Sequence, residues 1–227
     1  MKKLIVAVLA AVLIGSVFRT YQVQYLLHAN QVVILEPYMA LDVEIPEMGI
    51  SIHKPFDHKY GHGSGVLIGH RGYILTAGHM VKNSSLFFVK FKDGFKCKAV
   101  FVALDHKSDL ALLKIYAEKD VRFNGVNYLG LTPMVGDSVY HIGNPIDMKY
   151  ILTTGIVSSV TDYTISTTVI NPGSSGGALF NREGQLIGIC SALKTMSPFP
   201  AWSGHSLFVT VNDIKRFLGM WREVING

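Results

Sequence analysis

Residues 171–179 read Asn-Pro-Gly-Ser-Ser-Gly-Gly-Ala-Leu, a run of mostly small and turn-forming residues between two apolar stretches. Glycine adopts positive φ angles and lets the backbone come close to a bound atom. Such a loop can direct the amides of Gly173 and Ser175 at a substrate oxygen, with the Ser175 hydroxyl as nucleophile. A glycine-rich hairpin turn with a spare serine explains the same run. The catalytic interpretation therefore requires a base and an acid elsewhere in the chain.

A candidate base and a candidate acid each lie at the end of an apolar strand. Residues 73–78 lead into His79 through two small residues, and a histidine pKa near neutrality suits proton transfer. Asp109 begins the apolar run 110–115. A carboxylate beside a buried strand needs a partner, because an unpaired buried charge is costly. Alternatively, Asp109 is a turn residue that bonds its own backbone.

Composition and spacing predict one β-rich domain. The chain has 227 residues, of which 49% are hydrophobic and 16% charged, so it can bury a sizeable core. Short strand-like runs bounded by turn residues predict an antiparallel sandwich or barrel. These runs are residues 66–68, 73–76, 86–92, 96–104, 110–115, 138–142, 151–160, 163–169, 178–180, 186–191 and 207–210. Asn212 is expected to cap a final helix whose apolar stripe docks on the sheet.

The net charge of +5 includes one tight cluster of basic residues. Its members are Lys90, Lys92, Lys96 and Lys98. A three-residue loop over 93–95 would place Lys92 opposite Lys96 and Lys90 opposite Lys98, which keeps one strand face wet and the other dry. No aromatic residue is expected on the wet face, so we expect no nucleic-acid partner.

The N-terminus carries a membrane-targeting pattern. Lys2 and Lys3 precede an uncharged apolar run over residues 4–18. This length suits a signal peptide, while an extension over 20–23 would suit an uncleaved anchor, so residues 1–20 are assigned to either. We expect the N-terminus inside and the remainder exported and membrane-associated. Residues 21–60 are assigned to an N-terminal extension, although 31–35 is strand-like.

Cysteine and histidine spacing predicts neither a metal site nor a cofactor. Cys97 and Cys190 lie in strand-like runs and are expected to be free buried thiols, although an exported protein could join them. His53, His58 and His62 stand close together without the fixed spacing of a metal site.

Several blocks together resemble trypsin-like serine proteases, and specifically the protease domain of the HtrA (Deg) family. They are residues 63–68, 72–79, 108–115, 136–139, 142–145, 155–158 and 171–179. The resemblance implies an all-β fold of two six-stranded antiparallel barrels over residues 61–227, with a C-terminal α-helix and an N-terminal hydrophobic helix. It also implies a triad of His79, Asp109 and Ser175, with Ser191 hydrogen-bonded to the acid.

The chain departs from the family at Ser174, where HtrA proteases usually have Asn and digestive relatives have Asp. We therefore expect no activation by a freed N-terminus, and no PDZ domain after the final helix. The residue six before the nucleophile, Val169, predicts an apolar floor of the substrate pocket. One wall of this pocket is assigned to Cys190, Ser191, Ala192 and Leu193. Cleavage is expected after small or medium apolar residues.

These expectations describe a serine endopeptidase that acts on protein or peptide substrates and can form a homo-oligomer. The alternative is a catalytically silent, protease-like adaptor tethered to a membrane. Residues 173–177 also satisfy the G-x-S-x-G pattern of α/β-hydrolases, but that pattern needs a following helix and a downstream acid and histidine. Here a strand follows, and both partners lie upstream.

Overall fold

A computed structural model describes most of the chain after the N-terminal segment. The described residues are 22, 24–38, 40–45, 50–55, 61–82, 84, 86–116, 121–146, 148–191 and 204–226. The predicted N-terminal helix over residues 1–20 lies outside them. Among the described residues, no helix is long and apolar enough to cross a membrane.

The first barrel is a closed antiparallel sheet of six strands in the order β1-β4-β5-β8-β7-β6. Its strands are β1 (Val32–Tyr38), β4 (Gly63–Ile68), β5 (Tyr73–Ala77), β6 (Leu86–Lys90), β7 (Lys96–Asp105) and β8 (Leu110–Tyr116). Two 3-10 helices accompany them, η1 (Ala29–Gln31) before β1 and η3 (Gly78–Val81) after β5. Closure leaves no unpaired edge strand in this sheet.

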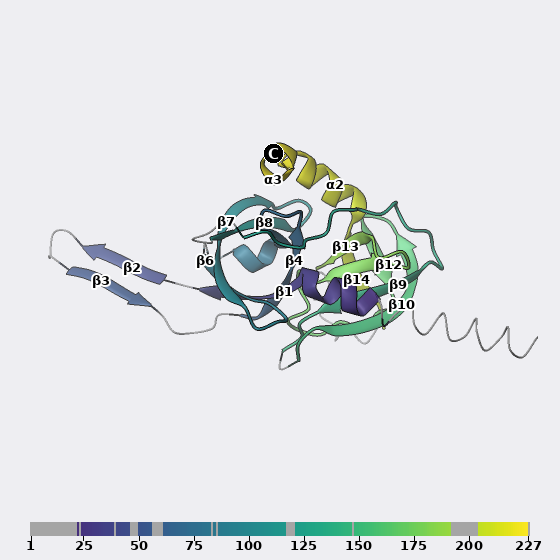
Figure 1. Ribbon diagram of the computed structural model, residues 1–227, viewed down its shortest axis with the longest axis horizontal. Helices are drawn as coiled ribbons and strands as arrows, with labels where there is room; N and C mark the ends of the chain where they lie inside the picture. Colours follow the sequence, from purple (N-terminus) through teal and green to yellow (C-terminus); the bar gives the residue numbers. More distant parts are fainter. Residues whose placement is uncertain are drawn as a thin grey trace, which may run out of the picture.

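The second barrel is also closed and has the order β10-β11-β14-β13-β12-β9. Its strands are β9 (Ser138–Gly143), β10 (Ile151–Val160), β11 (Tyr163–Ser166), β12 (Ala178–Asn181), β13 (Leu186–Cys190) and β14 (Ser206–Thr210). The two six-stranded barrels lie side by side, with the C-terminal helices above them in Figure 1. The predicted two-barrel, all-β fold with a C-terminal helix is confirmed.

The first barrel begins before residue 61, within the segment assigned to an extension. β1 pairs with β4 through Val32↔Val66 and with β6 through Ile34↔Lys90, so this strand closes the barrel. After β1 the chain forms a separate hairpin of β2 (Ala40–Ile45) and β3 (Ile50–Pro55). This hairpin projects away from the barrel in Figure 1.

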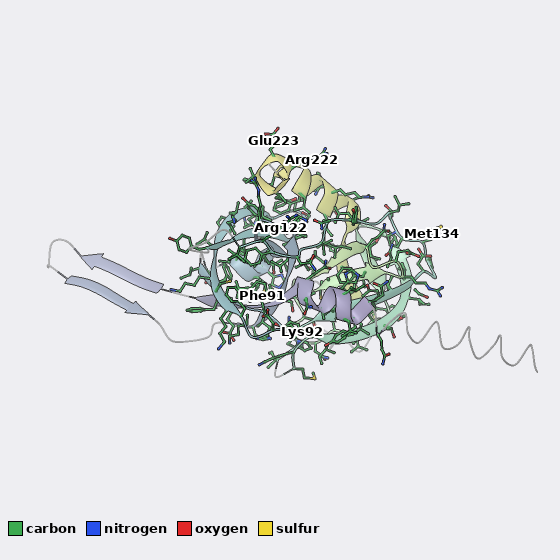
Figure 2. The ribbon with its side chains drawn as sticks, viewed as in Figure 1. Phe91, Lys92, Arg122, Met134, Arg222 and Glu223 are labelled. Atoms are coloured by element: carbon green, nitrogen blue, oxygen red, sulfur yellow. The ribbon has the colours of Figure 1, made fainter. Side chains whose placement is uncertain are left out.

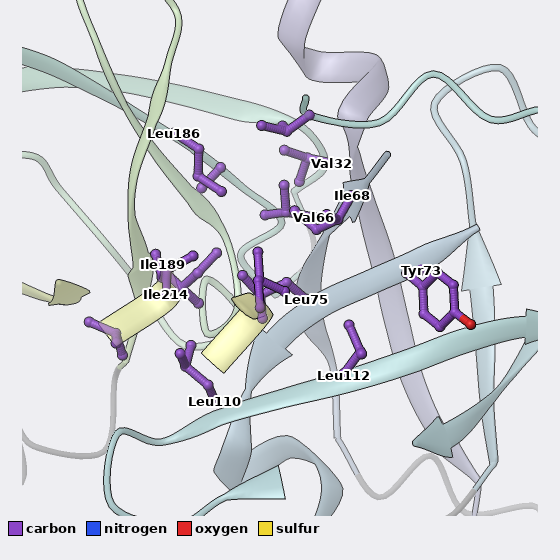
Figure 3. Close-up of a cluster of buried hydrophobic side chains, with 14 of the residues drawn as sticks. Val32, Val66, Ile68, Tyr73, Leu75, Leu110, Leu112, Leu186, Ile189 and Ile214 are labelled. Carbon is purple, nitrogen blue, oxygen red and sulfur yellow. The ribbon is translucent and has the colours of Figure 1, made fainter. Parts of the chain in front are cut away.

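The described core consists of three apolar clusters. One fills the first barrel, one fills the second, and the largest lies between them. In Figure 3, Val32, Val66 and Leu75 of the first barrel lie near Leu186 and Ile189 of the second. Burial of such side chains contributes about 1.5 to 3 kcal/mol each. The largest cluster therefore fixes the two barrels relative to one another and defines the contact across which a site can form.

The β6–β7 hairpin differs from its predicted register. Lys90 pairs with Lys96, and Lys98 lies opposite Phe88, because the loop contains residues 91–95. Phe91 turns inward, where its ring contacts Phe95 and Phe123, so it no longer continues the strand. The prediction of a wet lysine face holds, but Phe88 is 38% exposed among the lysines, contrary to expectation.

The C-terminal helix begins earlier than predicted. Helix α2 (Val211–Gly219) is capped by Thr210, whose hydroxyl accepts a hydrogen bond from the Asp213 amide at 3.2 Å. The predicted cap, Asn212, is wrong because the last strand runs directly into the helix. A second helix, α3 (Arg222–Asn226), follows, and Figure 2 shows Glu223 on its outward side. Ile214, Phe217 and Leu218 of α2 are buried, as the apolar stripe predicts.

The two cysteines are free, as expected, but only Cys190 is fully buried, whereas Cys97 is partly buried. Cys97 lies on β7 and Cys190 on β13, in different barrels. Burial raises the pKa of the Cys97 thiol to about 11 and raises that of Cys190 further. Both thiols are therefore protonated near neutral pH and are poor nucleophiles.

Candidate active site

His79 and Asp109 meet at the ends of two paired strands of the first barrel. Pairing of Ala77 with Leu110 brings the end of β5 beside the start of β8. His79 Nδ1 lies 3.0 Å from Asp109 Oδ2, and the His79 amide donates to Asp109 Oδ1 at 2.8 Å. Asp109 has φ +55°, a left-handed conformation that Asp tolerates better than most residues. This backbone turn directs the carboxylate at the histidine.

A residue of the second barrel completes the surroundings of Asp109. The Ser191 hydroxyl donates to Asp109 Oδ2 at 2.5 Å, as the family resemblance implied. Burial raises the pKa of the Asp109 carboxyl, but the hydrogen bonds from His79 and Ser191 and the charge of His79 outweigh this effect. The pKa of Asp109 is therefore lowered, so the carboxylate stays charged and can orient the imidazole.

The loop that carries Ser175 lies at the start of β12. Ser175 is 6% exposed, and Gly173 and Gly176 have φ angles of +95° and +82°. The amides of Gly176 and Gly177 donate to Cys190 O and Ser174 O, each at 2.8 Å. Within the described part of the chain, the amides of Gly173 and Ser175 have no hydrogen-bond acceptor. Buried amides are nearly always paired, so two without an acceptor in one loop are unusual.

Among the described residues, no hydrogen bond joins the Ser175 hydroxyl to the His79 imidazole. Such contacts are often long in proteins without a ligand and tighten when substrate binds. The structure therefore pairs His79 with Asp109 and shows no hydrogen bond from the Ser175 hydroxyl to either side chain among the described residues.

Ser64 of β4 joins the serine loop to the first barrel. Its amide donates to Ser175 O at 2.8 Å, and its hydroxyl donates to Gly173 O at 3.0 Å. The same hydroxyl accepts from the Asn144 amide at 2.8 Å. A Cβ on Gly176 would lie 2.0 Å from Ser64 O, so glycine is required at 176. Sequence reasoning did not predict this role of Ser64. The only indication of it in the sequence is a single hydroxyl residue among glycines and apolar residues.

Asn144 forms a second bridge between the barrels. It is fully buried, and its side-chain nitrogen Nδ2 donates to Val33 O of β1 at 3.1 Å. Its side-chain oxygen accepts from the Tyr150 amide at 2.8 Å, which orders the loop before β10. Asn144 thus connects β1 to the loop that packs against Gly173.

His141 and His62 both contact glycines of the serine loop. His141 of β9 is 2% exposed, and burial lowers its pKa to about 3. A Cβ on Gly177 would lie 2.6 Å from the Nε2 of His141, which is a clash. A Cβ on Gly173 would lie 2.9 Å from the His62 ring. Neither Nε2 atom has a hydrogen-bond partner among the described residues. Neither histidine belongs to a cluster that could hold a metal ion in the described part of the chain.

The residues assigned to the substrate pocket do not all lie in described parts of the chain. Val169 is 61% exposed and its carbonyl accepts from Thr153 of β10, while Cys190 and Ser191 are buried. Ala192 and Leu193 lie outside the described residues. The described part therefore contains an exposed apolar side chain at 169 and buried side chains at 190 and 191.

Comparison with known proteins agrees with this architecture. The family model of the trypsin-like peptidase domain matches residues 63–189. A probable periplasmic serine endoprotease, DegP-like, of Hahella chejuensis is 38% identical over 146 residues, 60% of this chain and 30% of the relative. The serine endoprotease DegS of Salmonella typhimurium is 37% identical over 137 residues, 56% of this chain and 38% of the relative. The chain thus spans well under half the length of these relatives.

The chain belongs to the family of trypsin-like peptidase domains. Its relatives within that family include the DegP-like and DegS serine endoproteases, as the resemblance to the HtrA (Deg) family implied.

Substitution of Ser64 by Ala should damage both stability and the serine loop. It leaves Gly173 O and the Asn144 amide without their shared hydroxyl, at a cost of about 1 to 3 kcal/mol in the free energy of unfolding. Urea unfolding measures this loss. Ser138→Ala, at an exposed serine, is the control and should stay within about 0.5 kcal/mol of the parent protein. Equal stability of the two variants would contradict the bridging role.

Burial of neutral His141 predicts an acid-sensitive fold. Its pKa is about 3 in the folded protein and 6.5 in the reference state, so its contribution is fully present above pH 6.5 and is lost as pH falls towards 3. Each pH unit in this window should cost about 1.4 kcal/mol. Urea unfolding at several pH values should show this loss in the parent protein, and a shallower loss in His141→Leu. Parallel curves would refute the burial argument.

Proposed function

We propose that this chain is a serine endopeptidase with Ser175 as nucleophile, His79 as general base and Asp109 as the acid that orients it. The observation that carries this proposal is the 3.0 Å contact between His79 Nδ1 and Asp109 Oδ2 beside the buried loop of Ser175. The family of the chain and the names of its relatives support it. A silent adaptor would have no need for a partly buried, hydrogen-bonded carboxylate behind a histidine.

In the proposed mechanism, Asp109 holds the Nδ1 proton of His79, which leaves Nε2 as the base. Nε2 takes the proton of the Ser175 hydroxyl as its oxygen attacks the substrate carbonyl. The amides of Gly173 and Ser175 receive the negative charge that develops on the carbonyl oxygen. His79 then gives the proton to the leaving amine, and water hydrolyses the acyl-enzyme by the same steps in reverse order.

The substrate preference is proposed to be small or medium apolar residues before the cleaved bond. The absence of an acid at position 169 and the buried apolar Cys190 support an uncharged pocket, with Ser191, Ala192 and Leu193 as the remaining wall. A library of peptides that differ at this position tests the preference. Preferred cleavage after Arg or Lys would refute the assignment of Val169 to the pocket floor.

The cellular setting is proposed to be the exported side of a membrane. The apolar run after Lys2 and Lys3 supports a signal peptide or anchor over residues 1–20, and relatives are named periplasmic. We propose that protein or peptide substrates meet the chain there, and that it assembles with copies of itself. Retention of the full chain in membranes after alkaline extraction would support the anchor, whereas full release would refute it.

Replacement of Ser175 by Ala should abolish turnover and leave the fold intact. Loss of a triad nucleophile lowers kcat by about 10⁴- to 10⁶-fold. The full chain and the variant are treated with an organophosphonate serine probe and assayed on casein. We expect Ser175-dependent labelling of the parent protein alone, with unchanged urea unfolding.

The matched control is Ser138→Ala, which removes an exposed serine of β9 and should keep both labelling and turnover. Equal casein hydrolysis by the parent protein and Ser175→Ala would contradict the proposed mechanism. Absence of turnover and of labelling in the parent protein would favour the adaptor.

A further inference from the structure

A buried imidazole lies directly beneath the serine loop. His141 is in the middle of β9, where it pairs with Thr153 of β10 and Leu179 of β12. Its ring centroid lies 5.6 Å from that of Phe208 on β14, and the residue is 2% exposed. Strands on both sides and an aromatic ring therefore hold the imidazole in place.

The imidazole occupies the space that two glycines leave open. A Cβ on Gly177 would lie 2.6 Å from Nε2, and a Cβ on Gly143 would lie 2.7 Å from Cε1. Real Cβ atoms do not approach other atoms so closely. The ring therefore packs directly against the two glycine backbones, in the space where larger residues would place a Cβ. Gly177 is two residues after Ser175, and its amide donates to Ser174 O at 2.8 Å. The ring thus packs directly against the turn 174–177.

The ring acts there by its shape. Its Nε2 has no hydrogen-bond partner among the described residues, and burial keeps the imidazole neutral near pH 7. The turn itself is closed by backbone bonds from Gly176 to Cys190 O and from Gly177 to Ser174 O. Removal of the ring would leave a cavity into which this turn can shift, because cavities in a packed core are only partly refilled.

We propose that His141 is a positioning residue, which sets the place of the Ser175 hydroxyl and amide by filling the space beneath the turn 174–177. This inference rests on the proposed function, because it concerns the nucleophile of that reaction. A displacement of the nucleophile by about 1 Å can lower the rate about 100-fold.

Two measurements test this role in the full chain. The first is kcat and KM on a peptide substrate. The second is hydrogen exchange at the turn 174–177, compared with exchange in β11, which reports the stability of the barrel. His141→Ala removes the ring, and His141→Leu refills most of the volume without a nitrogen. The matched control is Val157→Ala, which opens a cavity at another fully buried residue of the same barrel.

We expect His141→Ala to lower kcat by about 10- to 100-fold with KM within about twofold of the parent value. Exchange at the turn should rise by at least about 10-fold more than exchange in β11. His141→Leu should restore most of both losses. Val157→Ala should speed exchange in β11 without a selective change at the turn or in kcat.

Three results would overturn the proposal. The first is His141→Ala behaving like Val157→Ala in both measurements, and the second is His141→Leu remaining as impaired as His141→Ala. If the parent protein shows no Ser175-dependent turnover, the proposed function fails by itself, and exchange at the turn alone then decides the role of His141. The third result would be a rise in hydrogen exchange in His141→Ala that is as large in β11 as at the turn 174–177. Should His141→Ala not fold, His141→Val offers the same comparison with a smaller cavity.

Discussion

The arrangement of the site depends on one hydroxyl that lies between the two barrels. Ser64 of β4 connects Gly173 O and the Asn144 amide, while its own amide holds Ser175 O. His79 and Asp109 belong to the first barrel and Ser175 to the second, so any error in barrel placement would separate them. Burial of the large apolar cluster provides most of the free energy that holds the two barrels together, but the hydrophobic effect is not directional. The directional hydrogen bonds of Ser64 and Asn144 specify the alignment.

The serine loop is held by neutral groups. The buried Ser174 bonds reciprocally with Asn171, through its amide at 2.9 Å and its hydroxyl at 3.2 Å. No carboxylate lies at position 174, so the loop needs no ion pair with a freed amino group. Next to the loop, the Asp109 carboxylate carries a negative charge and accepts hydrogen bonds from His79 and Ser191. A loop held by packing and neutral hydrogen bonds is insensitive to salt, because screening acts on charges.

Sequence patterns predicted some local features well and others poorly. The turn at 69–72 gave the correct pairing of β4 and β5, because four polar and glycine residues separate two apolar runs. The register of β6 and β7 was mispredicted because Phe91 leaves the strand to pack on Phe123, a contact 32 positions away. The helix cap was mispredicted although the strand end at Thr210 was predicted, because helix α2 follows the strand without a linking residue and Thr210 itself accepts from the Asp213 amide.

The sequence by itself determined a β-rich domain and the candidate residues His79, Asp109 and Ser175, because residue types and turn spacing reflect local chemistry. The resemblance of its blocks to the HtrA (Deg) family implied the two-barrel fold. Tertiary structure decided that β1 closes the first barrel, that Ser64 links the two barrels, and that His141 lies beneath the serine loop. These features arise from contacts between residues far apart in the chain. Neither periodicity nor turn composition carries information about such contacts, because both describe only neighbours along the backbone.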